Sequence, residues 1–370
     1  YEIGSGLVGS EMCIRDRIEL INALPEELYN ITLVLLDSDN EYAYRLKKNV
    51  NIVQLTFNSS FAKSLVSMYA FPAKVLKKLS VNSFIAYYDF ISNCVTNVFE
   101  KTYDIAIDFY GYGSFVTAFL ATKIQAKKKA TWLHDEKPYW MKSVQKYLCE
   151  YDKIYGVSQA VVDAFCREYP HYKDKAAVFY NVIDIEEIKR KSEQDEIIPF
   201  KESFNIVTVG RLTEQKGYDI AIKAASILKK RKINFAWYAI GGGRDEKKLK
   251  KLVEKYCLEN QFVFLGRKKN PYPYMKHCDL YVQPSRHEGY VITLVEARAL
   301  CLPILSSDIP SAREQIQDGI NGYVAELSAE DLADKIEYLY NNPSQRKKTV
   351  EYLKEHPIDF STELLKLEII

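Results

Sequence analysis

The sequence predicts an α/β protein built from two consecutive doubly wound domains that face a cleft. Short, continuously apolar segments recur along the chain and alternate with helical patterns, which is typical of buried parallel sheets. This alternation occurs twice, and the highly charged residues 186–203 separate the two series. With 370 residues, 47% of them hydrophobic, the chain is long enough to form two such cores.

The first domain is expected over residues 18–185. Residues 19–27 resemble the end of a helix, and residues 61–100 are helical and aromatic. The loop Gly111-Tyr112-Gly113 follows one of the strands. The strands that we expect here are 31–39, 50–55, 103–109, 128–134, 153–158 and 176–184.

The second domain is expected over residues 204–343, after a linker formed by residues 186–203. Residues 344–370 are predicted to be C-terminal helices. Ligands of doubly wound sheets bind at the carboxyl ends of the strands, so residues at those ends are candidate site residues. The strands that we expect here are 204–210, 235–243, 262–266, 279–285 and 302–307.

Residues 1–17, YEIGSGLVGSEMCIRDR, are considered separately because they resemble the translation of a sequencing-library adapter. A short variable index within such an adapter accounts for Gly4-Ser5-Gly6. We therefore interpret residues 1–17 as a non-native segment. On this interpretation the first strand and loop of the first domain are missing, and the chain as written is expected to express poorly and to be inactive.

Composition limits the classes of partner and compartment. The net charge of +2 indicates no nucleic-acid partner. No segment approaches the roughly 18 to 20 uncharged apolar residues that span a membrane. The seven cysteines are scattered without paired spacing, which is typical of a reduced, cytoplasmic protein.

Two strand ends of the second domain carry residues suited to a nucleotide sugar. Residues 209–217, VGRLTEQKG, contain Gly210, Arg211 and Lys216 between a strand and a helix. A glycine lets a ligand approach the main chain, and two cations can neutralise a diphosphate without a metal ion. Gly242, at the end of the following strand, offers a similarly close approach.

The segment SRHEGYVITLVEARAL, residues 285–300, contains two glutamates around a predicted helix start. Glu288 is expected in the strand-to-helix loop, and Glu296 on the second turn of the helix. The amides at a helix start form an anion site. A carboxylate beside that site would accept hydrogen bonds from hydroxyls. A sugar, a diphosphate and a ribose in a row would thus explain both glutamates better than two solvated carboxylates.

Several segments together resemble the retaining glycosyltransferases of family four: GRLTEQKG, the FLG strand end, NPYPYMKHCDLYVQPSRHEGYVITLVEARALCLPILSSD and ARE…DGINGYVA. The resemblance covers nearly all of residues 18–370 and is most specific over 204–325. It implies the GT-B fold with two Rossmann-like domains, and a retaining reaction that needs no metal or other cofactor. Its implied substrate is a nucleoside-diphosphate sugar.

The resemblance also assigns roles to individual residues. Glu288 would contact the donor sugar and Glu296 the ribose, while Arg211 and Lys216 would bind the donor phosphates. The remaining donor contacts would come from main-chain groups of Gly289, Tyr290, Val291 and Ile292. Val291 departs from the family, which usually has Gly or Ser at this place, and a β-branched residue there is expected to narrow the loop.

In the first domain, TWLHDE (131–136) is similar to the family's W-I-H segment at a strand end. This similarity makes His134 a candidate polar group near the donor sugar and the acceptor, although a single histidine is more often structural. VSQAVVDAF and NVID (181–184) also match the family, the latter at its hinge. His287 is expected only to shape the loop.

The resemblance implies synthesis of a bacterial surface polysaccharide such as a capsule, with a glycan or a lipid-linked acceptor held mainly by the first domain. Residues 61–91 mix aromatic side chains with Lys63, Lys74, Lys77 and Lys78. Such a segment can make a peripheral membrane contact at the inner face of the plasma membrane. An ordinary helix packed on the sheet explains the same pattern at least as well.

Other functions remain open at this point. Asp37 and Asp39 follow a strand and mimic a metal-binding D-x-D pair, but a metal site would leave the second domain unexplained. A hydrolytic pair formed by Glu288 and Glu296 would not need the two cations. A sugar-nucleotide 2-epimerase and a non-catalytic nucleotide-sugar-binding subunit are the alternatives, because fold alone does not decide function.

Overall fold

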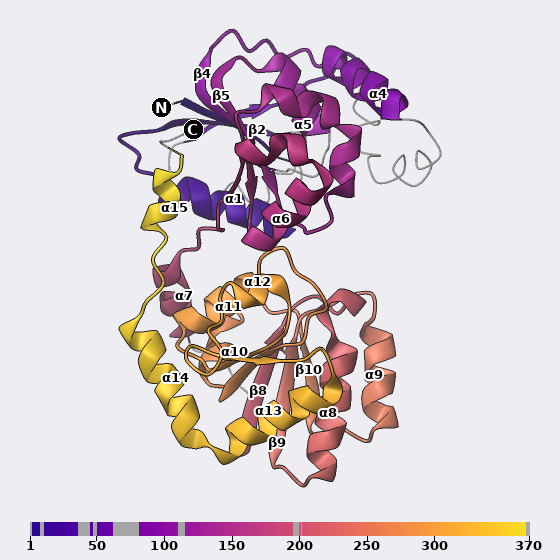
Figure 1. Cartoon of the computed structure of the whole chain (residues 1–370), viewed down its shortest axis with the longest axis vertical. Helices are drawn as coiled ribbons and strands as arrows, with labels where there is room; N and C mark the ends of the chain where they lie inside the picture. The colour runs from indigo at the N-terminus through magenta and orange to yellow at the C-terminus, as the bar shows by residue number, and fades with distance from the viewer. Residues whose placement is uncertain are drawn as a thin grey trace. The chain divides into compact units, whose positions relative to one another are not determined.

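The computed structural model describes residues 2–7, 11–35, 45, 46, 50–61, 81–109, 115–194, 200 and 202–367. The chain divides into two compact units (Figure 1). The first unit contains Tyr1–Ile183 and Phe360–Ile370, and the second contains Asp184–Asp359. Each unit has its own parallel sheet, which confirms the predicted α/β class with two doubly wound domains.

The first unit has a seven-stranded sheet in the order β3-β2-β1-β4-β5-β6-β7, and all of its strand pairs are parallel. Its strands are β1 (Glu2–Leu7), β2 (Asn30–Leu35), β3 (Asn51–Gln54), β4 (Tyr103–Asp108), β5 (Ala126–Leu133), β6 (Lys153–Gly156) and β7 (Ala176–Val178). Its α-helices among the described residues are α1 (Glu11–Ala23), α4 (Val81–Cys94), α5 (Phe115–Lys123), α6 (Gln159–Glu168) and α15 (Ser361–Leu365). Of the predicted helical region 61–100, residues 62–80 lie outside the described residues.

Glu2–Leu7 forms a central strand, in the place that the sequence analysis predicted to be empty. It pairs with β2 from Glu2↔Asn30 to Leu7↔Leu35, and with β4 from Ile3↔Ile105 to Ser5↔Ile107. The expectation that the first strand is missing is therefore not met in this structure. The physical reason is that a β-ladder uses main-chain donors and acceptors, which a short segment of almost any sequence can supply.

The second unit has a six-stranded parallel sheet in the order β10-β9-β8-β11-β12-β13. The strand order reverses between β8 and β11, and the carboxyl ends at such a point are where doubly wound sheets bind ligands. The strands are β8 (Phe204–Val209), β9 (Phe235–Ile240), β10 (Phe262–Gly266), β11 (Leu280–Gln283), β12 (Ile304–Ser307) and β13 (Tyr323–Ala325). Strand β13 has only three residues and was not predicted from the sequence.

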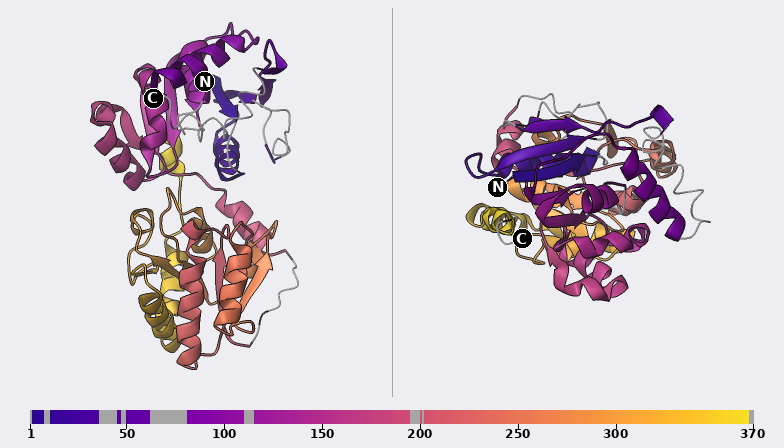
Figure 2. Two further views of the ribbon diagram at one scale, coloured as in Figure 1. Left: turned by 90° about the vertical axis from the view of Figure 1, so that its right-hand side faces the viewer. Right: turned by 90° about the horizontal axis from the view of Figure 1, so that it is seen from above.

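Helices of the second unit form two groups. In one, α8 (Tyr218–Lys230) contacts both α9 (Glu246–Lys255) and α13 (Ala329–Asn341), as Figures 1 and 2 show. In the other, α10 (Tyr272–Lys276) and α11 (Ile292–Ala299) contact each other and α7 (Ile185–Ser192). The remaining helices are α12 (Pro310–Arg313) and α14 (Pro343–Glu355). Strand β9 is buried along its whole length, as expected of a strand covered on both faces.

The boundaries of the units differ from the predicted ones. Residues 186–192 of the predicted linker belong to helix α7 of the second unit. Asp184 caps the first turn of α7 by accepting from the Glu187 amide at 2.8 Å. Of the predicted C-terminal helices, α14 belongs to the second unit, whereas α15 returns to the first. There Glu363 accepts a hydrogen bond from the Tyr180 amide at 2.9 Å. The charged residues predicted a linker, whereas the structure buries Ile188 and Ser192 of this segment within α7.

The helices within the described ranges are all too short or too polar to cross a membrane.

Candidate functional site

The candidate site lies in the second unit, where the loops after β8, β9 and β11 meet. Two glycines make the close packing of these loops feasible. Gly217 has a φ of +68°, and a Cβ atom there would lie 1.8 Å from the Pro284 carbonyl oxygen. A Cβ on Gly241 would lie 1.9 Å from the Gly210 carbonyl oxygen. These glycines are needed for contact between loops, a reason that the sequence analysis did not consider.

Gly210 and Gly242 border the same loops. A Cβ on Gly210 would meet the aliphatic part of Lys216 at 3.6 Å, which is ordinary contact. A Cβ on Gly242 would meet the Arg267 side chain at 2.9 Å. Arg267 is flexible, so Gly242 tolerates a side chain better than Gly217 or Gly241 does.

Lys216 and Glu288 form an ion pair, although the sequence predicted that they bind different parts of the donor. The Lys216 Nζ lies 2.6 Å from the Glu288 Oε1, and the two side chains are 12% and 4% exposed. Lys216 ends the short 3-10 helix η6 (Glu214–Lys216), whereas Glu288 is in the loop after β11. Lys216, which was predicted to bind phosphate, is thus in direct contact with Glu288, which was predicted to bind the sugar.

Three residues that the sequence analysis missed hold Glu288. The Ser285 hydroxyl donates to Oε1 at 2.7 Å, and Gln283 Nε2 approaches the same oxygen at 3.4 Å. The Ser311 hydroxyl donates to the Glu288 main-chain carbonyl at 2.9 Å. Gln283 and Ser285 could have been predicted from the sequence, because they lie at the end of an apolar strand. Polar side chains buried at such a place must form hydrogen bonds.

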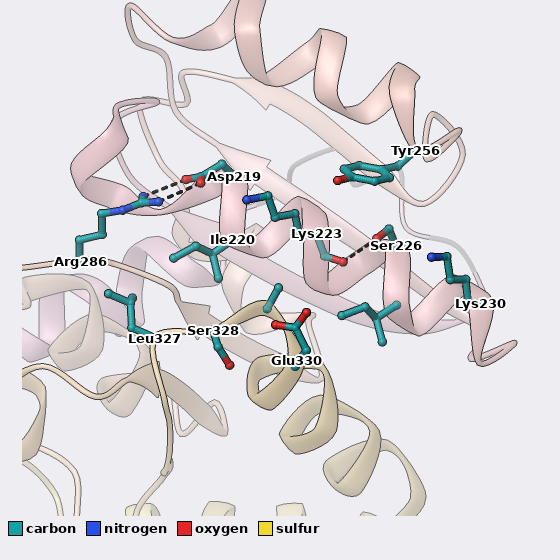
Figure 3. A pocket seen from close by; sticks show the side chains of 12 residues that line it. Asp219, Ile220, Lys223, Ser226, Lys230, Tyr256, Arg286, Leu327, Ser328 and Glu330 are labelled. Atoms are coloured by element: carbon teal, nitrogen blue, oxygen red, sulfur yellow. Dashed lines mark hydrogen bonds and ion pairs between the residues drawn. The ribbon is translucent and has the colours of Figure 1, made fainter.

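A second ion pair fixes the same loop to helix α8. Arg286 contacts both carboxylate oxygens of Asp219 at 2.8 Å (Figure 3). Burial opposes the ionisation of Asp219, but the hydrogen bonds and charge of Arg286 outweigh it and lower the pKa of this carboxyl. Arg286 also donates to the Glu214 carbonyl at 2.6 Å. Bidentate pairs of this kind are geometrically specific, so the loop of Glu288 is held at a defined place.

Arg211 differs from Lys216 in its surroundings. Its side chain is exposed, and no residue in the described parts of the chain pairs with it. It follows β8 and Gly210 directly, at the reversal of strand order. Its cation is therefore available to an anionic ligand.

The start of helix α11 provides main-chain donors. Its N-cap, Val291, makes no side-chain capping bond. Within the described residues, the amides of Gly289, Val291 and Ile292 have no acceptor. Uncapped amides at a helix start attract anions. The Val291 side chain is only 2% exposed, so it packs inside the protein. It therefore does not project from the loop surface into the space where a ligand would bind.

Glu296 lies on the second turn of α11, as predicted, and is 2% exposed. Tyr272, at the start of α10, donates its hydroxyl to Glu296 Oε1 at 2.9 Å. Tyr272 was not predicted as a site residue from the sequence. The remaining predicted residue of this loop, Tyr290, is buried at 9% exposure. The main-chain carbonyl of His287 accepts a hydrogen bond from Gln215 Nε2 at 3.0 Å.

His134 lies in the first unit, directly after β5. Its Nε2 is 2.8 Å from the Phe109 carbonyl, so this nitrogen carries the proton and Nδ1 is the acceptor of the neutral ring. The ring also packs against the Phe109 ring, with the centroids 5.5 Å apart. Burial, with a smaller contribution from the Arg17 cation, lowers the pKa of His134 to about 4. The side chain is therefore neutral at pH 7.

This shift predicts a pH dependence of the first unit. A histidine with a pKa near 6.5 in the unfolded chain and about 4 in the folded chain binds more protons when unfolded. Its stabilising effect is therefore complete above pH 6.5 and is lost as the pH falls toward 4, by up to about 3 kcal/mol. Urea unfolding between pH 7.5 and 4.5 should show a weaker acid dependence for His134→Gln. His171→Gln, at an exposed histidine of the same unit, is the control and should behave as the wild type.

A groove of about 520 Å³ lies between α8 and the start of α13 (Figure 3). Lys223, Lys230, Tyr256 and Glu330 are among the residues that line it. None of the predicted site residues lines it. Asp37 and Asp39, the alternative metal ligands, lie outside the described residues.

Most of the second unit is similar to a known family and to curated proteins. Residues 189–356 match the family model of glycosyl transferases group 1. An uncharacterized glycosyltransferase of Methanocaldococcus jannaschii is 33% identical over 172 residues, which are 45% of this chain and 40% of the relative. The N-acetylgalactosamine-N,N'-diacetylbacillosaminyl-diphospho-undecaprenol 4-alpha-N-acetylgalactosaminyltransferase of Campylobacter jejuni is 30% identical over 184 residues, 47% of this chain and 49% of the relative. The chain spans about half the length of these curated relatives.

Solved structures agree with the fold of the whole chain. Anabaena HepE in complex with UDP has a TM-score of 0.74 at 15% identity, covering 100% of this chain and 98% of that one. The lipopolysaccharide outer core galactosyltransferase WaaB has a TM-score of 0.69 at 14% identity, covering 100% and 99%. The fold is GT-B, as in these solved structures, and residues 189–356 are similar to the glycosyl transferases group 1 family.

Proposed function

We propose that the protein is a retaining glycosyltransferase that moves a sugar from a nucleoside-diphosphate sugar to a glycan or a lipid-linked acceptor. The observation that supports this most strongly is the set of groups at the ends of β8 and β11. There an available cation, a lysine–glutamate pair and uncapped helix amides lie on adjoining loops. Anionic and hydroxylated parts of one ligand would need such a combination.

The groups would divide the donor among them. Arg211, Lys216 and the amides at the start of α11 would stabilise the charge that develops on the leaving diphosphate. Glu288 would accept a hydrogen bond from a sugar hydroxyl, and Glu296 from the ribose. His134, in the first unit, would serve the sugar or the acceptor as a neutral hydrogen-bonding group.

In the proposed reaction the acceptor oxygen forms a bond to the anomeric carbon while the bond to the diphosphate oxygen breaks. The acceptor proton passes to that leaving oxygen on the same face, which gives retention. We propose that the cations replace a metal ion, so that activity persists in EDTA. Activity that EDTA abolishes and Mn²⁺ restores would instead indicate a role for Asp37 and Asp39.

A biological role in bacterial surface polysaccharide synthesis is proposed from the names of relatives. One, from Erwinia amylovora, is an amylovoran biosynthesis glycosyltransferase that is 34% identical over 128 residues. The Campylobacter relative is named for an undecaprenol-linked acceptor. We propose that the first unit binds such an acceptor on the cytoplasmic side, with residues 61–91 in peripheral membrane contact. Residues 61 and 81–91 of this segment are described. Among them Phe61 and Phe90 are 66% and 53% exposed, whereas Tyr88 and Ile91 are buried.

The first experiment identifies the donor and separates the two glutamates. UDP, GDP, ADP and CDP, alone and as sugar conjugates, are screened by thermal shift, and the selected nucleotide is used in calorimetry. Glu288→Gln should lower turnover more than binding of the bare nucleotide, because its proposed partner is the sugar. Glu296→Gln should weaken binding of the bare nucleotide by about 1.5 to 3 kcal/mol, because its proposed partner is the ribose. Equal effects of both variants would contradict this division.

The products distinguish the alternatives. A transferase forms a glycoside only when an acceptor is added, whereas a 2-epimerase releases a new sugar nucleotide without one. Binding of a nucleotide sugar without either product would identify a non-catalytic subunit.

A further inference from the structure

We propose that Gln283 is a positioning residue that fixes the Glu288 carboxylate relative to the start of helix α11. This inference rests on the proposed function, because it concerns the same donor site. Gln283 is the last residue of β11 and is 1% exposed. A buried amide side chain at this place must satisfy two donor and two acceptor positions from its neighbours.

All four positions of the Gln283 amide are used. Its Nε2 donates to the Ser285 hydroxyl at 2.6 Å and approaches Glu288 Oε1 at 3.4 Å. Its Oε1 accepts from the hydroxyls of Tyr281 and Thr293, the latter at 2.9 Å. An ionised carboxylate only accepts, so Nε2 must be the atom that faces Glu288. The reversed amide would place two acceptors against each other.

The two oxygens of Glu288 consequently have different surroundings. Oε1 receives the Lys216 ammonium, the Ser285 hydroxyl and the Gln283 amide. No residue in the described ranges donates to Oε2. One oxygen is thus anchored to the protein, and the other remains to accept from a ligand hydroxyl.

The bond from Thr293 extends the same constraint to the helix. Thr293 is the second residue of α11, whose first amides have no acceptor among the described residues. Gln283 therefore joins the carboxylate proposed for the sugar to the amides proposed for the diphosphate. Sugar and diphosphate are consecutive parts of one donor, joined by the bond that breaks. A change in the distance between Glu288 and the amides would therefore misplace the two ends of that bond. Misplacement by about 1 Å can lower a rate by about two orders of magnitude.

Turnover and binding of the bare nucleotide should respond differently to the loss of the Gln283 side chain. Gln283 is assigned no substrate contact, and a bare nucleoside diphosphate needs only the cations, the amides and Glu296. Losing the Gln283 bonds should therefore spare binding of the bare nucleotide while lowering turnover at saturating donor. A residue that only stabilises the fold would lower neither quantity in the folded fraction.

Gln283→Met tests this, because methionine has a similar length and forms none of the four bonds. We expect turnover of the selected nucleotide sugar, measured as nucleotide release with water as acceptor, to fall roughly tenfold or more. The dissociation constant of the bare nucleotide should change less than about twofold. Thr208→Val is the matched control. It removes a buried hydroxyl in the adjacent strand β8 that bonds the Val282 carbonyl at 2.8 Å and Trp237 at 3.0 Å. Thr208→Val should cost similar stability without changing turnover.

Two further variants keep the test decisive if Gln283→Met does not fold. Gln283→Glu keeps the acceptor for Tyr281 and Thr293 but replaces the donor with an oxygen facing Glu288. Ser285→Ala deletes only the hydroxyl between Gln283 and Glu288. Both should lower turnover in the same direction. Wild-type turnover in these variants, with active wild-type protein, would overturn the inference and leave the proposed function standing. A wild-type protein that binds no nucleotide sugar would instead overturn the proposed function.

Discussion

Lys216→Ala is expected to destabilise the second unit by about 3 kcal/mol and to weaken nucleotide binding as well. The substitution leaves the Glu288 carboxylate, which is 4% exposed, without the ammonium that lies 2.6 Å away. Removing one partner of a buried ion pair typically costs about 3 to 5 kcal/mol. Ser285 and Gln283 still donate to Glu288, which favours the lower value. Urea unfolding and calorimetry with the bare nucleotide measure the two effects.

Arg211→Ala should separate these effects, because Arg211 is exposed and has no partner in the described residues. Its loss should weaken nucleotide binding by about 1.5 to 3 kcal/mol and change stability by less than about 0.5 kcal/mol. Lys223→Ala, at an exposed lysine of α8, is the control and should change neither.

The double variant Lys216→Ala with Glu288→Gln should recover much of the stability, since no buried charge then remains unpaired. A Lys216→Ala protein as stable as the wild type would show that the pair contributes little.

Ser5→Pro is expected to prevent correct folding of the first unit. The Ser5 main chain is paired with Leu33 of β2 on one side and Ile107 of β4 on the other. Proline removes the amide donor of the ladder, and within sheets it is confined to edge strands, strand starts and bulges. Exposed edges of β2 and β4 would then favour aggregation. Soluble yield and thermal unfolding measure the effect, and Ser5→Ala, which keeps the amide, is the control.

Residues 1–17 also allow a test of the hypothesis that this segment is derived from a sequencing adapter. Glycines inside a strand weaken it, and β1 contains Gly4 and Gly6. Replacing residues 1–17 with the upstream codons of the source genome should therefore raise the soluble yield and the activity. Equal yield and turnover for both chains would show that the segment is native or dispensable.

Local patterns in the sequence were sufficient for much of the fold. Continuous apolar runs predicted the parallel strands, because a strand covered on both faces must be apolar throughout. The apolar positions after Thr293 predicted helix α11, and with it the loop position of Glu288 and the second-turn position of Glu296. These features depend on residues that are neighbours along the chain.

The chemistry of the site depended on the tertiary structure. Lys216 and Glu288 are 72 positions apart, and only the pairing of β8 with β11 brings their loops together. The same pairing, and the register of α11, decide that Gln283 reaches Ser285, Glu288 and Thr293 at once. The membership of α7 in the second unit was likewise decided by its contacts with α10 and α11. Residue types indicate which ligands a site can bind, whereas the atoms that meet are set by strand order and helix register.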